Sequence, residues 1–233
     1  MINRVRLQPL FSSNSNKTIG YEALFRKEAN KDFPGAATIL SIIAQNCDMQ
    51  RDIYINMSVN DAMNPKFADE FIEVMERIGI SGDKIVLEVS ESTNPAHIPQ
   101  TKQMLSKLRN YGVRIALDDF GMSYSSLNFL KEFPVDIVKI DQQFVQSAPS
   151  SKKARTLMKF VIDLSHELDC LVVAEGIETE EAYQCAVEAG ADICQGFFFS
   201  DFAGYPSRFI QLREFKSRTR ESYSKTLSQV MGI

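Results

Sequence analysis

The chain has 233 residues, 44% of them hydrophobic, and is therefore long enough to form one large domain with a substantial core. Its formal net charge of −4 argues against a general binder of nucleic-acid polymers, because such a protein needs excess Lys and Arg to neutralise phosphates. Residues 1–17 lack the apolar core of a signal peptide, and no later run approaches the ~20 apolar residues of a membrane span. We therefore expect a soluble, cytoplasmic protein without a membrane segment.

The cysteine pattern favours reduced thiols. The four cysteines show no CxxC pairing, and two of them lie inside apolar runs. They are Cys47, Cys170, Cys185 and Cys194. We expect them to be core residues of a cytosolic protein rather than a disulfide or zinc framework.

Short β-prone runs recur along the chain, and most are separated by stretches with helical spacing. The predicted strands are residues 4–11, 18–25, 52–58, 84–90, 113–119, 136–141, 170–176 and 192–199. The predicted helices include residues 65–79, 97–112, 154–169 and 179–190, several of which end in Gly. The polar segment between the first two strands has no room for a crossover helix, so these strands should form an antiparallel hairpin.

Strands that alternate with helices pair in parallel through right-handed crossovers, and about eight such units favour a closed barrel. The sequence thus predicts an α/β fold, an irregular TIM (β/α)8 barrel whose first strand is antiparallel. A doubly wound open sheet is the alternative. We expect residues 1–233 to form a single domain, with residues 205–233 forming a mildly basic C-terminal helix that packs on the barrel.

Oxygen-bearing side chains end nearly every predicted strand, where the mouth of such a barrel lies. They belong to Glu22, Asn56, Glu88, Glu91, Asp118, Asp119, Asp141, Glu175, Glu178 and Gln195. Any of them alone would be interpreted as a solvated strand end or a helix cap, but their recurrence on seven strands favours a common site. Carboxylate and amide oxygens suit Mg²⁺ or Mn²⁺, whereas Zn²⁺ more often recruits Cys or His.

The adjacent Asp118 and Asp119 form the most informative acidic pair. Neighbouring strand residues point to opposite faces, so both can share a site only if the strand ends between them, and Gly121 favours such an exit. Two neighbouring carboxylates could hold a pair of cations ~4 Å apart, the geometry that clamps the attacking water and leaving oxygen in phosphoryl transfer. Lys139, inside an apolar run, could orient that water or stabilise charge on a phosphate.

These residues resemble the motifs of the EAL-domain family, the bacterial phosphodiesterases of cyclic di-GMP (c-di-GMP). In the family's order, they are EALFR (22–26), NMS (56–58), EVSES (88–92), DDFG (118–121), VKID (138–141), AEGIE (174–178) and QGF (195–197). The resemblance implies an irregular TIM barrel and metal-dependent hydrolysis of c-di-GMP to linear pGpG. It also implies a homodimer that lowers a second messenger of biofilm and motility. We expect a stand-alone EAL domain controlled through its expression, its dimerisation or a separate sensor or regulator protein, or else a domain excised from its sensor.

The resemblance also implies residue roles. One divalent cation, Mg²⁺ or Mn²⁺, would be bound by Glu22, Asn56, Glu88 and Asp118. A second would be bound by Asp118, Asp119 and Glu175. The catalytic set would be Glu22, Lys139 and Glu175, with Lys139 assisting the hydrolytic water. Substrate contacts or pocket positions would be those of Gln8, Arg26, Asp141, Glu178 and Gln195, while Glu91 would support a loop.

The chain departs from the family pattern in four places. Met122 and Ser123 replace Thr and Gly in the usual DDFGTG loop, Ser90 replaces Thr, and Asp201 stands in an altered rim. The stretch from Arg26 to Asn56 is short, which predicts that one helical element is trimmed or missing. The altered loop and the short stretch support the alternative of a catalytically weak or inactive EAL domain that acts as a c-di-GMP receptor or protein-binding regulator, whereas the retained ligand residues favour the enzyme. A third hypothesis is that the chain is a different TIM-barrel hydrolase that acts on another phosphodiester.

Overall fold

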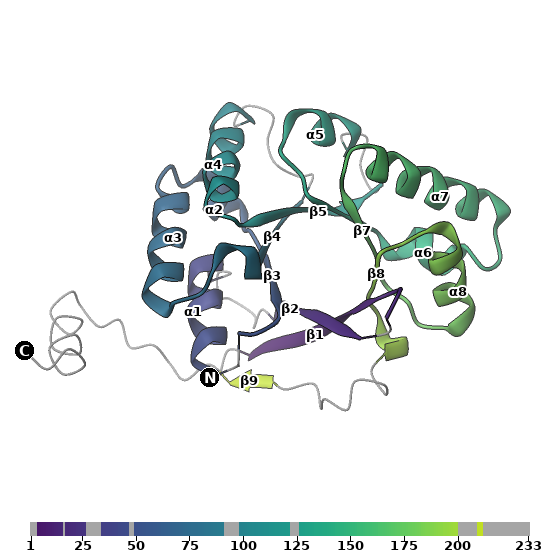
Figure 1. Ribbon diagram of the computed structural model, residues 1–233, viewed down its shortest axis with the longest axis horizontal. Coiled ribbons are helices and arrows are strands. Elements are labelled where there is room, and N and C mark those ends of the chain that lie inside the picture. The colour runs from purple at the N-terminus through teal and green to yellow at the C-terminus, as the bar shows by residue number, and fades with distance from the viewer. Residues whose placement is uncertain are drawn as a thin grey trace, which may run out of the picture.

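The strands form a ring that is closed by an antiparallel first strand. The computed structural model describes residues 4–15, 17–26, 34–46, 49–90, 98–121, 126–199 and 209–211. The sheet order is β2-β3-β4-β5-β6-β7-β8-β1-β9, with a further β1–β2 pairing that closes the barrel. Figure 1 shows the strands as a ring with helices around its outside. The predicted irregular TIM barrel is confirmed, and the open sheet is excluded.

The strands alternate with helices after an initial hairpin. The strands are β1 (Arg4–Ser12), β2 (Thr18–Arg26), β3 (Asp52–Asn56), β4 (Ile85–Ser90), β5 (Arg114–Phe120), β6 (Ile137–Ile140), β7 (Leu171–Ala174), β8 (Ile193–Cys194) and β9 (Phe209–Gln211). The helices are α1 (Ala36–Asn46), α2 (Val59–Met63), α3 (Phe67–Ile78), α4 (Ile98–Asn110), α5 (Ser126–Glu132), α6 (Gln142–Ser147), α7 (Lys152–Glu167) and α8 (Glu180–Ala189). Pairings from β2 to β8 are parallel, whereas β1 is antiparallel to β2 and β8.

Helix ends follow the sequence closely. Ser151 and Thr179 cap α7 and α8, accepting hydrogen bonds from the third backbone N–H that follows each cap. Gly79 and Gly190 end α3 and α8 with φ of 71° and 101°, a left-handed conformation that costs glycine little. These helices therefore begin and end close to their predicted bounds.

Two predictions need correction or restriction. The helix predicted over residues 205–233 does not include Phe209–Gln211. These residues form β9, which pairs antiparallel with the first residues of β1, Arg4–Arg6. The rest of that segment lies outside the described residues. The stretch from Arg26 to Asn56 contains α1, which buries Ile39, Leu40 and Ile43, so a helix is not missing there; that it is trimmed stays a prediction.

Two further predictions concern the cysteines and the absence of membrane spans. Cys170 and Cys194 are buried, as predicted for core residues, whereas Cys185 is only half-buried; all three are free thiols, and Cys47 lies outside the described residues. Within the described segments, no helix is both long enough and apolar enough to cross a lipid bilayer.

Candidate active site

A layer of polar side chains lies directly above an apolar layer inside the barrel. The apolar layer is formed by Leu10, Tyr54, Val86, Ala116, Ile137, Val173 and Ile193. Residues two positions apart on a strand point to the same face, so the next inward residues can be read from this layer. Towards the mouth they are Gln8, Asn56, Glu88, Asp118, Lys139, Glu175 and Gln195, and Glu22 pairs with Gln8 across β1 and β2.

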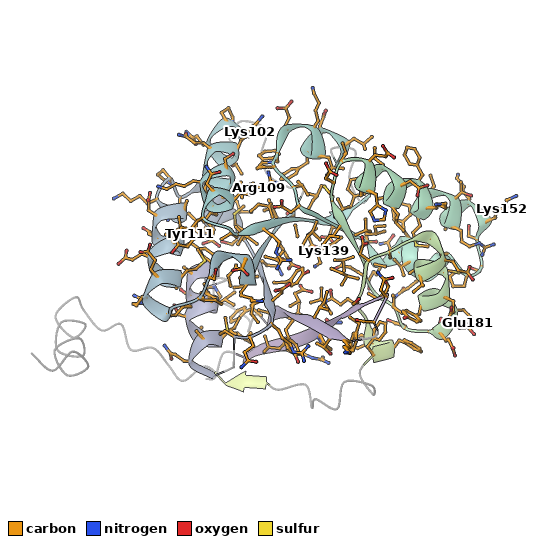
Figure 2. The ribbon with its side chains drawn as sticks, viewed as in Figure 1. Lys102, Arg109, Tyr111, Lys139, Lys152 and Glu181 are labelled. Carbon is orange, nitrogen blue, oxygen red and sulfur yellow. The ribbon has the colours of Figure 1, made fainter. Side chains whose placement is uncertain are left out.

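Lys139 lies at the centre of this polar layer, as Figure 2 shows, whereas Lys102 and Lys152 lie on the outside of the barrel. Its Nζ lies 2.6 Å from Glu88 Oε1 and 2.7 Å from Glu175 Oε1. The same atom lies 3.1 Å from Asp118 Oδ1 and 3.6 Å from Glu22 Oε2. The Lys139 side chain is 1% exposed, so these ion pairs are screened little by solvent.

Two amide side chains orient the acids from the strand ends. Asn56 Nδ2 donates to Glu22 Oε1 at 3.2 Å and to Glu88 Oε2 at 2.9 Å. Gln195 Nε2 donates to Glu22 Oε2 at 2.5 Å. Gln195 Oε1 is buried and has no hydrogen-bond partner among the described residues, which leaves an acceptor available inside the site.

A bulge brings Asp118 and Asp119 to the same site. Leu117 pairs with Val138 and Phe120 with Ile140, so β5 contains one extra residue relative to β6 at this point. Asp119 has a φ of 55°, and the expectation that the strand ends between the two aspartates is therefore wrong. Ligand atoms of Asp118, Asp119 and Glu175 all lie within 4.8 Å of one another.

Burial and crowding perturb the protonation of the acids. Burial, reinforced by Glu22, raises the pKa of Glu88 well above its usual range. Burial also raises the pKa of Glu175 to about 8, although Lys139 opposes the shift. Burial alone would raise the pKa of Glu22, but Lys139, Gln195 and Asn56 hold it below its ordinary value.

Burial disfavours the charge on Lys139, yet the surrounding carboxylates, led by Glu175, raise its pKa well above the usual range. Fully ionised, the cluster would contain five negative charges and one positive charge, leaving −4; its acids are Glu22, Glu88, Asp118, Asp119 and Glu175. Oxygen donors with this charge fit hard divalent cations such as Mg²⁺ or Mn²⁺. The ammonium of Lys139 shows that the pocket already accommodates a cation.

Other predicted site residues lie outside this cluster or outside the described part. Gln8 is half-buried on the inward face of β1, and Glu178 is exposed after β7. Asp141 is buried, but its Oδ1 accepts from Gln143 N at 2.8 Å and caps α6. Arg26 ends β2, and nothing is described of its side chain. Glu91, Met122, Ser123 and Asp201 lie outside the described residues.

Sequence reasoning missed two residues near this site, Arg6 and Phe197. Arg6 lies two residues before Gln8 on β1, and Phe197 follows Gln195 by two residues. The guanidinium carbon of Arg6 lies 5.9 Å from the centroid of the Phe197 ring. The period of two along β1 would have revealed Arg6, whereas the contact with Phe197 requires the fold.

The protein is a closed (β/α)8 barrel. Buried acids surround a lysine at the carboxyl ends of its strands, which is where barrels of this class carry their active sites. The family model described as the EAL domain matches residues 37–201, and the chain belongs to the EAL-domain family.

Known proteins resemble the chain in sequence and structure. The cyclic di-GMP phosphodiesterase NbdA of Pseudomonas aeruginosa is 32% identical over 64% of this chain and 19% of its own length. The EAL domain of Mycobacterium smegmatis DcpA is 27% identical with a TM-score of 0.75, covering 96% of this chain and 94% of that one. The PaMucR phosphodiesterase, in complex with c-di-GMP, is 25% identical with a TM-score of 0.73, covering 87% of this chain and 91% of that one. The chain spans 19–27% of the length of the first curated relatives.

Proposed function

We propose that the chain hydrolyses one phosphodiester bond of c-di-GMP to give linear pGpG, using two divalent cations. The observation that supports this most is the layer of acids from several strands converging on Lys139 within 3.6 Å of its Nζ. The names of NbdA and PaMucR, which specify phosphodiesterases associated with c-di-GMP, supply the substrate class.

The acids would divide between two cation positions that share Asp118. Glu22, Asn56, Glu88 and Asp118 would hold one Mg²⁺ or Mn²⁺. Asp118, Asp119 and Glu175 would hold the other. Bound cations at such sites supply an activated water and stabilise charge on the phosphate oxygens.

The protein's own residues would orient and electrostatically support the reaction. The ammonium of Lys139 would hold the nucleophilic water and stabilise negative charge that develops on the phosphate. Asn56 and Gln195 would fix the Glu22 carboxylate through the hydrogen bonds at 3.2 Å and 2.5 Å. Gln8, Arg26, Asp141 and Glu178 would contact or surround the substrate, and Glu91 would support the adjoining loop.

Purified protein incubated with c-di-GMP and Mn²⁺ or Mg²⁺ should form pGpG, measured by liquid chromatography, and EDTA should stop its formation. Glu22→Gln, which keeps the size of the side chain but removes its charge, should abolish turnover. Lys159→Met, on the exposed face of α7, is the matched control and should retain it. A protein that binds c-di-GMP but forms no pGpG over hours would instead be a receptor.

Two further proposals concern the cellular location and the oligomeric state of the protein. We propose that the protein acts in the cytoplasm, because its substrate is a small second messenger, and that it forms a homodimer, as the family resemblance implies. Light scattering of purified protein at several concentrations measures the dimer directly, and a constant monomer mass would reject it.

A further inference from the structure

Arg6 lies on the wall of the barrel between the acid cluster and the mouth. On β1, Arg6 and Gln8 share the inward face of Leu10, whereas Val5 and Leu7 pack into the outer core. Gln8 is opposite Glu22, and Arg6 is opposite Leu24, near the carboxyl end of β2. Two residues of strand separate Arg6 from Gln8, which corresponds to ~7 Å towards the mouth.

The guanidinium of Arg6 is incompletely hydrogen-bonded within the described part of the chain. Among the described residues, its buried Nε has no hydrogen-bond partner and its guanidinium makes no ion pair. A guanidinium without a charged partner is incompletely paired, so a ligand that supplies acceptors to it would gain strong, charge-assisted hydrogen bonds. Arg6 as a whole is only half-buried, so the terminal guanidinium nitrogens are the donors that a ligand could reach.

The ring of Phe197 lies against the guanidinium of Arg6, and hydrogen bonds to Ile177 fix the turn that carries Phe197. Ile177 N donates to Gln195 O, and Phe198 N donates to Ile177 O, both at 3.0 Å. A Cβ on Gly196 would lie 1.9 Å from Ile177 O, so only glycine permits this close approach. Phe197 projects from this turn with 60% of its surface exposed, beside Arg6.

We propose that Arg6, backed by Phe197, contacts a guanine of the substrate and selects guanine over adenine. The proposal rests on the proposed function, because it requires a cyclic dinucleotide in the mouth. A guanidinium presents a planar fork of donors that matches the O6 and N7 acceptors of guanine. Adenine places an amino donor where guanine has O6, so the same fork would meet a donor and lose the interaction.

The test separates base recognition from the acid cluster by using two substrates with Mn²⁺. For c-di-GMP, Arg6→Ala should raise KM about tenfold with kcat changed less than about twofold, as expected for a lost binding contact. Hydrolysis of bis(p-nitrophenyl) phosphate, which has no nucleobase, should be unchanged. Arg6→Lys should behave like Arg6→Ala, because lysine keeps the charge but lacks the fork.

Equilibrium binding in EDTA provides a second measurement that does not require turnover. The unchanged protein should bind c-di-GMP more tightly than c-di-AMP, and Arg6→Ala should bring the two dissociation constants close together. Arg77→Ala, on the exposed side of α3, is the matched control and should keep both values. Circular dichroism confirms that each variant is folded.

The outcomes distinguish this inference from the proposed function. If the unchanged protein binds or cleaves c-di-GMP and Arg6→Ala does so with a KM or dissociation constant within twofold, only the Arg6 assignment fails. Full affinity in Arg6→Lys would also overturn it, since charge alone would then suffice. If the unchanged protein neither binds nor cleaves c-di-GMP, both the proposed function and the inference fail.

Discussion

Replacing Lys139 with Met should destabilise the metal-free protein strongly. The change removes the ammonium whose Nζ lies 2.6–3.6 Å from four carboxylate oxygens and leaves these acids without their cation. Removing one partner of a buried ion pair typically costs ~3–5 kcal/mol. For a domain of this size each kcal/mol lowers Tm by ~2–4 °C, so a drop of ~6–20 °C in EDTA is expected.

The loss should depend on pH and on metal. The folded pKa of Glu175 is raised to about 8, above its unfolded value, so its contribution to stability is present at low pH and lost as pH rises through 8. Without Lys139 that pKa rises further, and the Tm difference between variant and unchanged protein should be larger at pH 8.5 than at pH 6. Mn²⁺ should restore more Tm to the variant than it adds to the unchanged protein, because the ammonium no longer competes.

Differential scanning fluorimetry in EDTA and in Mn²⁺, at both pH values, measures these effects. Lys159→Met is the control, since Lys159 is exposed and its pair with Asp163 should contribute no more than ~1 kcal/mol. A Lys139→Met protein with the same Tm as this control in EDTA would show that the ammonium does not hold the acids together. The electrostatic account of the site would then be wrong.

Two further changes test the metal site. The affinity for Mn²⁺ should rise as pH increases towards 8.5, because Glu175, with a pKa of about 8, must release its proton to bind a cation; calorimetry at several pH values measures this, and a flat profile would contradict it. Asp119→Gly should keep or raise Tm in EDTA by relieving the φ of 55°, while weakening Mn²⁺ binding at least about tenfold. Unaltered Mn²⁺ binding in that variant would remove Asp119 from the ligand set.

Most of the barrel could be predicted because its long amphipathic helices and β-prone runs carry local signals. The elements that were missed have weak signals. α1 is the exception, because its buried Ala36, Ile39, Leu40 and Ile43 have the i, i+3, i+4, i+7 spacing of one helix face; the further apolar residues Ala37, Ile42 and Ala44 beside this stripe obscured it. α2 and α6 have only five and six residues, too few for a period of 3.6 to be recognised. β8 was predicted too long because the turn at Gly196 depends on contact with Ile177, which is remote in sequence.

The acids at the strand ends could likewise be predicted, since a polar residue follows each apolar strand centre by two positions. Their arrangement around Lys139 could not, because it depends on closure of the barrel. The shared site of Asp118 and Asp119 depends on a bulge that the sequence does not indicate. The pattern can also select a residue with another role. Asp141 is an acid at a strand end, as the pattern requires, but its side chain caps α6.

The reversed direction of β1 determines where the polypeptide enters the barrel. In a barrel whose strands are all parallel, the first strand starts at the face opposite the mouth. Here Arg4 pairs with Arg26 at the carboxyl end of β2, so the strand starts at the rim and runs down past Arg6 and Gln8. A domain joined ahead of β1 would therefore be attached at the mouth of the barrel. A displacement of that domain would be transmitted to Gln8 directly along β1.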